Sequence, residues 1–526
     1  MEDLVFKNAR IFDGTGADSF KGDVYVKGDV ISKVVSNSGN EESIDARLVV
    51  DAEGLFLSPG FVDTHTHSDM ILLYDRQHIS SLSQGVTTEI LGQDGLSYAP
   101  LSKDNLEQYV KYLRGLNGDF GNSFNFNYGS VYEFRENYNN KVSINTAYLF
   151  PHCSLRLETV GFKDEKLSGS SLEKAKAMLR KGLSEGACGF STGLSYFPAA
   201  YSDTEELIEL CKVVREFDSV FVIHLRTVFK GEPFDNVAEA IEIASKAKCK
   251  LHFSHYKTNR KTIGKVKTIL EKITKAISEG VDITLELYPY AYGASYAAMF
   301  LPYWASDGGF EAIMQRLSDK EMRSKIAKEI DRQHIIDDAI ISNLINNVEY
   351  IGLSFKGVAK LRNQTIGELI CDLLYEEELA FSFYDFPGED IEELDKIFSR
   401  DIFELLSLDN YMIGSDAILV GENPHPRAFG TFTKLLRLSR EHGFRLETLI
   451  NRMTQVPCSR FKLNRRSLIK QGYYADIVVF DYENVKDRST NRFSRNLSEG
   501  INHVVVNGKL AFFNKQATGI FAGRAV

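Results

Sequence analysis

Apolar and polar residues alternate in short runs at both ends of the chain, and this two-residue period is typical of half-buried β-strands. Three such runs lie within residues 4–54 and are separated by glycine-containing turns. The pattern returns in residues 475–481 and 501–513, where Asn507-Gly508 is a strong signal for a two-residue hairpin turn. We therefore expect both chain ends to form one small β-sandwich.

The middle of the chain follows a different pattern, in which short apolar or β-branched runs alternate with longer amphipathic stretches. Such alternation is typical of repeated βα units and a parallel sheet. Eight candidate strands end near His67, Asp94, His152, Thr192, His224, His255, Tyr288 and Asp416. Eight strands with intervening helices predict an α/β fold with a closed, TIM-like (β/α)8 barrel rather than an open sheet.

The lengths of these segments also predict a division of the chain. The stretch from about residue 290 to about residue 410 is too long for a simple crossover, so we expect an insertion before the last barrel strand. We assign residues 1–57 and 465–526 to the two parts of the β-sandwich, and residues 58–464 to the barrel with its insertion.

Composition and charge narrow the functional classes. The chain has 526 residues, 43% of them apolar and 25% charged, which is ordinary for a globular protein. Its formal charge of −10 and its lack of any long basic block disfavour nucleic acid as a partner. The chain has no apolar run long enough to cross a membrane, and its first residues do not resemble a secretory signal. Six cysteines without a CxxC pair suit reduced thiols, so we expect a cytoplasmic protein without a membrane partner.

Candidate chemistry gathers at the carboxyl ends of the predicted strands, where barrel enzymes build their sites. His65, His67, His224, His255 and Asp416 all fall at such ends. His65 and His67 are two residues apart, so on a strand their side chains leave from the same face and can converge on one ion. Because imidazole suits zinc and similar ions, the pattern predicts a metal centre.

Eight segments of the sequence, in this order, resemble the N-acyl-D-amino-acid deacylases, or D-aminoacylases, of the amidohydrolase superfamily. They are SPGFVDTHTHSD, EGACGFSTGLSYFP (185–198), HLR (224), SHYK (254), YPY (288), GSDA (414), HPRAFGTF (425) and ADIVVFD (475). The resemblance covers nearly the whole chain. It implies a metal-bearing barrel with a small β-sandwich from both termini, and it implies hydrolysis of N-acyl-D-amino acids by a metal-activated water.

The resemblance also implies a metal ligand set. One ion position falls to His65, His67 and Asp416, and a second to His224 and His255. One or two divalent ions per subunit, zinc among them, are therefore expected. The family's mechanism gives Asp416 the role of general base and general acid, which suits a carboxylate at a strand end.

One departure from the family's pattern concerns Asp94. The family usually places a metal-binding cysteine in a GNCG-like segment here, whereas this chain reads LGQDG. A carboxylate also binds zinc and can bridge two ions, but as a harder ligand it shifts the preference towards harder metals. The alternative is that Asp94 is only a turn residue before Gly95.

Four further residues match the positions where the family contacts its substrate: Tyr196, Lys257, Tyr288 and Arg427. The expected partner is a small molecule with a carboxylate, which cations and hydroxyl groups bind well. Ala294 stands where the family usually has a serine, so one substrate contact differs. The number of subunits stays open, and a homo-oligomer is one possibility.

Two alternatives compete with this interpretation. One is another reaction of the superfamily, either hydrolysis of a cyclic amide, as in dihydroorotases and hydantoinases, or deamination. The fourth predicted strand ends in Ser191-Thr192-Gly193, without the lysine that hydantoinases carboxylate, and this disfavours the cyclic-amide type. The other is a barrel that lost its chemistry and serves in assembly, which the retained histidines and Asp416 argue against.

Overall fold

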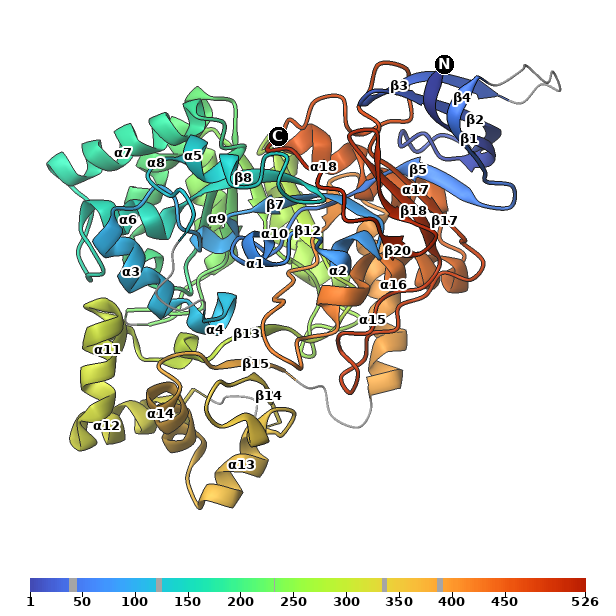
Figure 1. Ribbon diagram of the computed structural model, residues 1–526. Coiled ribbons are helices and arrows are strands. Elements are labelled where there is room, and N and C mark those ends of the chain that lie inside the picture. The colour runs from blue at the N-terminus through green and yellow to red at the C-terminus, as the bar shows by residue number, and fades with distance from the viewer. Residues whose placement is uncertain (37–44, 120–124, 231, 334–337, 386–390) are drawn as a thin grey trace.

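The computed structural model describes residues 1–36, 45–119, 125–230, 232–333, 338–385 and 391–526. Its centre is a sheet of eight parallel strands (Figure 1). In chain order these are β6 (Phe61–Asp63), β7 (Val86–Leu91), β8 (Asn145–Pro151), β9 (Gly189–Gly193), β10 (Val220–His224), β11 (Lys250–Phe253), β12 (Ile283–Leu287) and β16 (Tyr411–Ile413). The strands lie in the sheet in the same order as in the chain, from β6 through β12, and β16 lies beside β12.

Backbone hydrogen bonds between the first and last strands close this sheet into a barrel. Thr64 N–H donates to Ile413 O at 3.1 Å, and Asp416 N–H donates to His65 O at 2.7 Å. An isolated parallel bridge joins Thr66 to Ala417 just beyond the strand ends. The TIM-like barrel predicted from the sequence is therefore confirmed.

Helices surround the barrel and bury apolar side chains against it. In α8, Asp203 caps the helix by accepting a hydrogen bond from Glu206 N–H at 2.9 Å. The main surrounding helices are α3 (Lys103–Tyr112), α5 (Val131–Glu136), α6 (His152–Thr159), α7 (Gly169–Ser184), α8 (Thr204–Glu216), α9 (Asn236–Ala247), α10 (Val266–Ser278), α15 (Ile391–Leu406), α16 (Arg427–His442), α17 (Leu446–Met453) and α18 (Gln455–Arg460). Short turns of helix occur at α1 (Ile71–Tyr74), α2 (Ile79–Leu82) and α4 (Arg114–Asn117).

Both chain ends build a second, mixed sheet, as expected for the β-sandwich. Its strands are β1 (Glu2–Ile11), β2 (Phe20–Lys27), β3 (Val30–Ser36), β4 (Ala46–Asp51), β5 (Phe56–Pro59), β17 (Ile477–Phe480), β18 (Ile501–Val506), β19 (Lys509–Phe513) and β20 (Gln516–Ala517). Strands from the two ends meet where β5 pairs with β17, and they share a core that includes Phe6, Val26 and Val479. The predicted hairpin joins β18 to β19, and Asn507 and Gly508 both have positive φ, as its turn type requires.

Gly60 alone separates β5 of this sheet from β6 of the barrel. A Cβ atom at Gly60 would lie 2.2 Å from Thr87 Cγ2, so only glycine fits at this junction. The barrel and the terminal sheet pack directly against each other, since the ring of Phe61 on β6 lies edge-on to that of Phe480 on β17.

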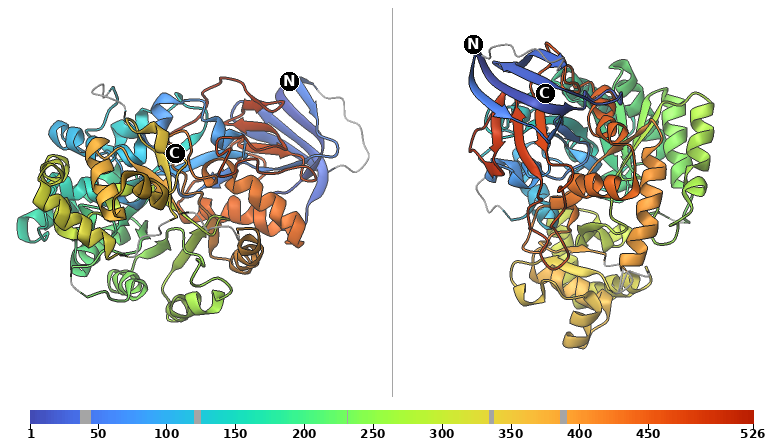
Figure 2. Two further views of the ribbon diagram at one scale, coloured as in Figure 1. Left: turned by 90° about the horizontal axis from the view of Figure 1, so that it is seen from below. Right: turned by 90° about the vertical axis from the view of Figure 1, so that its right-hand side faces the viewer.

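The segment between β12 and β16 carries its own small sheet, with β15 (Ser382–Tyr384) between β13 (Ala294–Tyr296) and β14 (Ile340–Asn343). Its helices are α11 (Gly309–Ser318), α12 (Lys320–Asp331), α13 (Phe355–Arg362) and α14 (Ile366–Glu376). Figures 1 and 2 show this segment and the N-terminal strands at opposite ends of the molecule. We keep the division at residues 57 and 464 as a proposal. No helix within the described ranges is long and apolar enough to cross a bilayer.

Candidate metal centre

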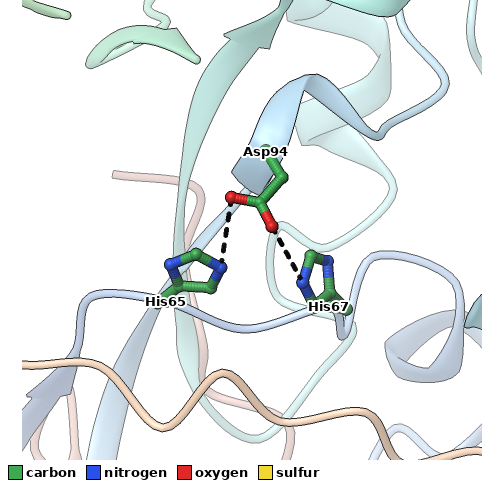
Figure 3. A group of neighbouring side chains, drawn as sticks. All are labelled: His65, His67 and Asp94. Atoms are coloured by element: carbon green, nitrogen blue, oxygen red, sulfur yellow. Dashed lines mark ion pairs between the residues drawn. The ribbon is translucent and has the colours of Figure 1, made fainter. Parts of the chain in front are cut away.

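A first group of metal-binding side chains lies just beyond β6 and β7 (Figure 3). His65 Nε2 is 3.6 Å from Asp94 Oδ1, and His67 Nε2 is 3.7 Å from Asp94 Oδ2. The two histidines follow the last residue of β6 rather than lying within the strand, yet both rings face the same carboxylate. Three donors from two neighbouring loops thus converge.

A second group shares Asp94 with the first. His224, the last residue of β10, places Nδ1 3.5 Å from Asp94 Oδ2. His255, two residues beyond β11, places Nε2 2.9 Å from the same His224 Nδ1. Asp94 therefore lies between two pairs of histidines, with one carboxylate able to serve both.

Asp416 lies beside both histidines of the first group. Its Oδ1 is 3.4 Å from His67 Nε2 and 3.7 Å from His65 Nε2, while its Oδ2 is 2.8 Å from Arg427 Nη1. The backbone N–H of Asp416 donates to His65 O, so the bond that closes the barrel also holds this carboxylate beside the histidines.

Three of these residues have a left-handed backbone, which is uncommon outside glycine. Their φ angles are 55° for Asp94, 36° for His255 and 54° for Asp416. Such conformations persist where the surrounding structure holds them, and they cluster at functional sites. Three of the loops that carry candidate ligands thus have this uncommon conformation at the ligand itself.

Burial and neighbouring charges together set the protonation of the group. Burial alone would raise the pKa of Asp94, but His65 and His224 hold it well below its usual range. Burial likewise opposes ionisation of Asp416, and Arg427 is the main group that holds its pKa low. Burial lowers the pKa of His255 to about 3. Two ionised carboxylates and a neutral imidazole are the forms that bind cations.

The donor set fits a divalent metal ion. His65 Nε2 and Asp94 Oδ1 are buried and have no hydrogen-bond partner among the described residues. Buried polar atoms are rarely left without a partner, so these two atoms face a position that an ion can fill. Histidine nitrogen with carboxylate oxygen is a common ligand combination for zinc.

Comparison with known proteins identifies the family. A model of the amidohydrolase family matches residues 48–364 and 396–512. The chain belongs to the amidohydrolase family.

Relatives within the family cover the whole of this amidohydrolase. It is 29% identical over 530 residues to the D-aminoacylase of Alcaligenes xylosoxydans xylosoxydans, covering 100% of this chain and 97% of that protein. It is 28% identical to the N-acyl-D-aspartate deacylase of the same organism, over 96% of this chain and 91% of the relative. The crystal structure of the N-acyl-D-glutamate deacylase of Bordetella bronchiseptica, complexed with zinc and a phosphonate inhibitor, superposes with a TM-score of 0.82 at 26% identity, covering 100% and 99% of the two chains. The resemblance drawn from the motifs is confirmed.

The four residues predicted to contact substrate lie around the metal centre of this amidohydrolase. Arg427 is fully buried, its guanidinium lies 4.8 Å from the centroid of the Tyr288 ring, and its Nε has no hydrogen-bond partner in the described chain. Lys257 Nζ lies 4.3 Å from the Tyr288 centroid, and burial lowers its pKa to about 7. The Tyr196 ring lies 4.8 Å from the His224 ring. The backbone at Ala294, the position of the family's serine, accepts a hydrogen bond from Arg427 Nη2 at 3.1 Å.

Sequence reasoning missed two residues of this amidohydrolase site. Glu286 on β12 is completely buried and contacts His65 Nδ1 at 2.5 Å. His425 precedes Arg427 by two residues, and its Nδ1 accepts a hydrogen bond from Arg427 N–H at 3.0 Å. The available signal was a lone carboxylate in the apolar run of β12 and a histidine beside the predicted arginine.

Proposed function

We propose that the protein is a metal-dependent hydrolase that cleaves the amide bond of N-acyl-D-amino acids, releasing a carboxylate and a free D-amino acid. Full-length similarity to D-aminoacylase and to the N-acyl-D-aspartate and N-acyl-D-glutamate deacylases supports this reaction. The observation that carries it in this chain is Arg427, a buried cation whose Nη1 is 2.8 Å from Asp416 Oδ2. An α-carboxylate bound by Arg427 brings the rest of the substrate close to Asp416.

Each side chain of the site has its own role in such a reaction. When bound, a divalent ion polarises the scissile carbonyl and lowers the pKa of water. Asp416 takes a proton from the attacking water and delivers it to the leaving nitrogen, while the water oxygen bonds to the carbonyl carbon and the C–N bond breaks. Arg427 and Lys257 bind the α-carboxylate, and Tyr288 lies against both cations. Tyr196 covers His224 from the insertion side, where its ring stacks on Tyr296.

We propose one or two zinc ions at this centre, a cytoplasmic location, and a small carboxylate-bearing substrate. Zinc in the superposed relative and the two donor groups that share Asp94 support the metal. Unpaired cysteines support the location. A homo-oligomer stays a prediction.

A panel of N-acetyl D- and L-amino acids tests the proposed reaction. The zinc-loaded protein should release free amino acid from D-substrates alone, as measured by amine release. The Asp416→Asn variant supplies the matched control for contaminating activity. Activity on L-forms alone would reject the D-specific assignment. Turnover of cyclic amides, with no turnover of any linear substrate, would favour the alternative reaction of the superfamily.

Replacing Arg427 with methionine should mainly raise KM for the D-substrate, because the α-carboxylate is bound in both ground and transition states. A buried charge-assisted contact is worth about 1.5 to 3 kcal/mol, so a loss of about 10- to 150-fold in kcat/KM is expected. Because Arg427 also pairs with Asp416, a smaller fall in kcat should accompany it.

Lys434→Met is the matched control for this variant. Lys434 is another buried cation of α16, seven residues further along the helix, and it pairs with Asp395 at 3.2 Å. Its loss should leave KM unchanged. Equal KM values for Arg427→Met and the parent would remove Arg427 from the substrate site.

A further inference from the structure

Glu286 is a buried carboxylate of β12 that contacts candidate metal ligands. Its side chain is completely buried, and residues from the neighbouring strands surround it. Oε1 lies 2.5 Å from His65 Nδ1 and 3.4 Å from the backbone nitrogen of His255. Oε2 accepts a hydrogen bond from Thr64 Oγ1 and lies 3.1 Å from His252 Nε2. One carboxylate thus contacts the loops that carry ligands of both donor groups.

Neighbouring atoms pack closely against this carboxylate. A Cβ atom added at Gly414 would lie 2.7 Å from Glu286 Oε2 and 2.6 Å from His65 Cβ, so the last barrel strand packs closely against both. His252 is in turn fixed by Thr284, whose Oγ1 lies 2.8 Å from His252 Nδ1. Glu286 is therefore held in place independently of any ion.

The contact with Glu286 determines which nitrogen of His65 is free. An ionised carboxylate only accepts hydrogen bonds, so His65 Nδ1 must carry the proton that it donates to Oε1. In the neutral form of the ring, which is the form that binds metal, Nε2 is then unprotonated. It is the nitrogen that lies 3.6 Å from Asp94 Oδ1 and has no hydrogen-bond partner in the described chain. A carboxylate behind a ligating histidine fixes its tautomer and ring orientation and makes it a stronger ligand.

We propose that Glu286 is a positioning residue of the metal centre, which holds His65 in the tautomer and orientation that present Nε2 to the ion. This inference rests on the proposed function in one respect, which is that the function requires a metal at His65. Glu286 belongs to neither of the two donor groups. Removing its charge should therefore weaken metal binding without unfolding the protein.

The test compares Glu286→Gln with Thr284→Val. Glutamine preserves the shape of Glu286 and can still contact Thr64 and His65, but it lacks the negative charge. Thr284 lies two residues earlier on β12, so it faces the same side of the strand, and it contacts His252 but not His65. Thr284→Val thus disturbs the polar interior of the barrel without touching the ligand.

Three quantities are measured: zinc affinity of the metal-free protein by competition with a chelating dye, its melting temperature without zinc, and kcat/KM at saturating zinc. Glu286→Gln should bind zinc about 10- to 100-fold more weakly, with a melting temperature close to that of the parent. Thr284→Val can affect His65 only through His252 and Glu286, so it should lower zinc affinity much less than Glu286→Gln does. Saturating zinc should recover much of the activity of Glu286→Gln.

Zinc affinity of Glu286→Gln within about threefold of the parent would overturn the inference, as would an equal loss in Thr284→Val. If Glu286→Gln does not fold, Glu286→Asp serves as the test instead. Aspartate keeps the charge, but its shorter side chain withdraws the carboxylate from His65. Parental affinity in Glu286→Asp would then reject the positioning role, and a loss of about tenfold or more would support it. A parent that binds zinc but hydrolyses no N-acyl-D-amino acid would reject the proposed function while leaving this comparison valid.

Discussion

Replacing Asp416 with asparagine is expected to lower kcat by at least about two decades, because general acid-base catalysis contributes about 10² to 10⁴ in rate. Asparagine has nearly the shape of aspartate, and its amide oxygen can still face His65 and His67. It cannot accept a proton from the attacking water at neutral pH. Arg427 should still bind the substrate carboxylate, so KM should change much less than kcat.

The measurement is kcat together with zinc stoichiometry and circular dichroism. Metal at His224, His255 and Asp94 should survive, since none of these ligands has changed. Asp23→Asn provides the control, because Asp23 is a buried carboxylate of the terminal sheet that accepts a hydrogen bond from Asn8 N–H at 2.8 Å. A folded, zinc-loaded Asp416→Asn protein with more than about a tenth of parental kcat would show that another group moves the proton.

The barrel and most of its candidate site could be predicted because both follow from local patterns. A parallel strand must be apolar to be buried, and a barrel collects its polar residues where strands end, so His224 and Asp416 stand out in the sequence. The hairpin at Asn507 is equally local, because its turn selects residues that tolerate positive φ.

Other features depend on contacts between distant segments and leave little trace in the sequence. Glu286 looks like an isolated charge in an apolar strand until β6 and β11 supply its partners, more than 200 residues away for His65. The convergence of His65 and His67 was expected from strand alternation, yet both residues lie beyond β6 and are aimed by the closure with β16. Distances across a closed sheet cannot be derived from a two-residue period.

Asp94 is the residue whose role the sequence pattern leaves open. Its segment, Gly92-Gln93-Asp94-Gly95, suits a turn as well as a ligand, and in the structure Gln93–Gly95 forms a single turn of 3-10 helix. The φ of 55° at Asp94 is a turn conformation, and the same conformation points the carboxylate between His65, His67 and His224. The metal content of Asp94 variants therefore tests the ligand role.

Asp94→Ala is expected to lower zinc affinity by at least about 100-fold, because it removes the donor common to both groups. This loss exceeds the one expected for a residue that contacts a ligand but not the ion. Alanine also fits poorly at a φ of 55°, so a loss in this variant alone could reflect backbone strain. Asp94→Gly is the matched control, since glycine adopts this conformation without strain and equally lacks the carboxylate. Both variants should lose zinc to the same extent.

Asp94→Cys places at this position the cysteine that is usual in the family. A thiolate should restore zinc binding, and it should favour zinc over manganese more strongly than the parental carboxylate does, since soft sulfur suits zinc and hard oxygen suits manganese. Competition between the two ions, followed by metal analysis of the washed protein, measures this preference directly. If Asp94→Ala and Asp94→Gly both keep the parental zinc content, Asp94 serves only the turn, and the two pairs of histidines must bind metal without a shared carboxylate.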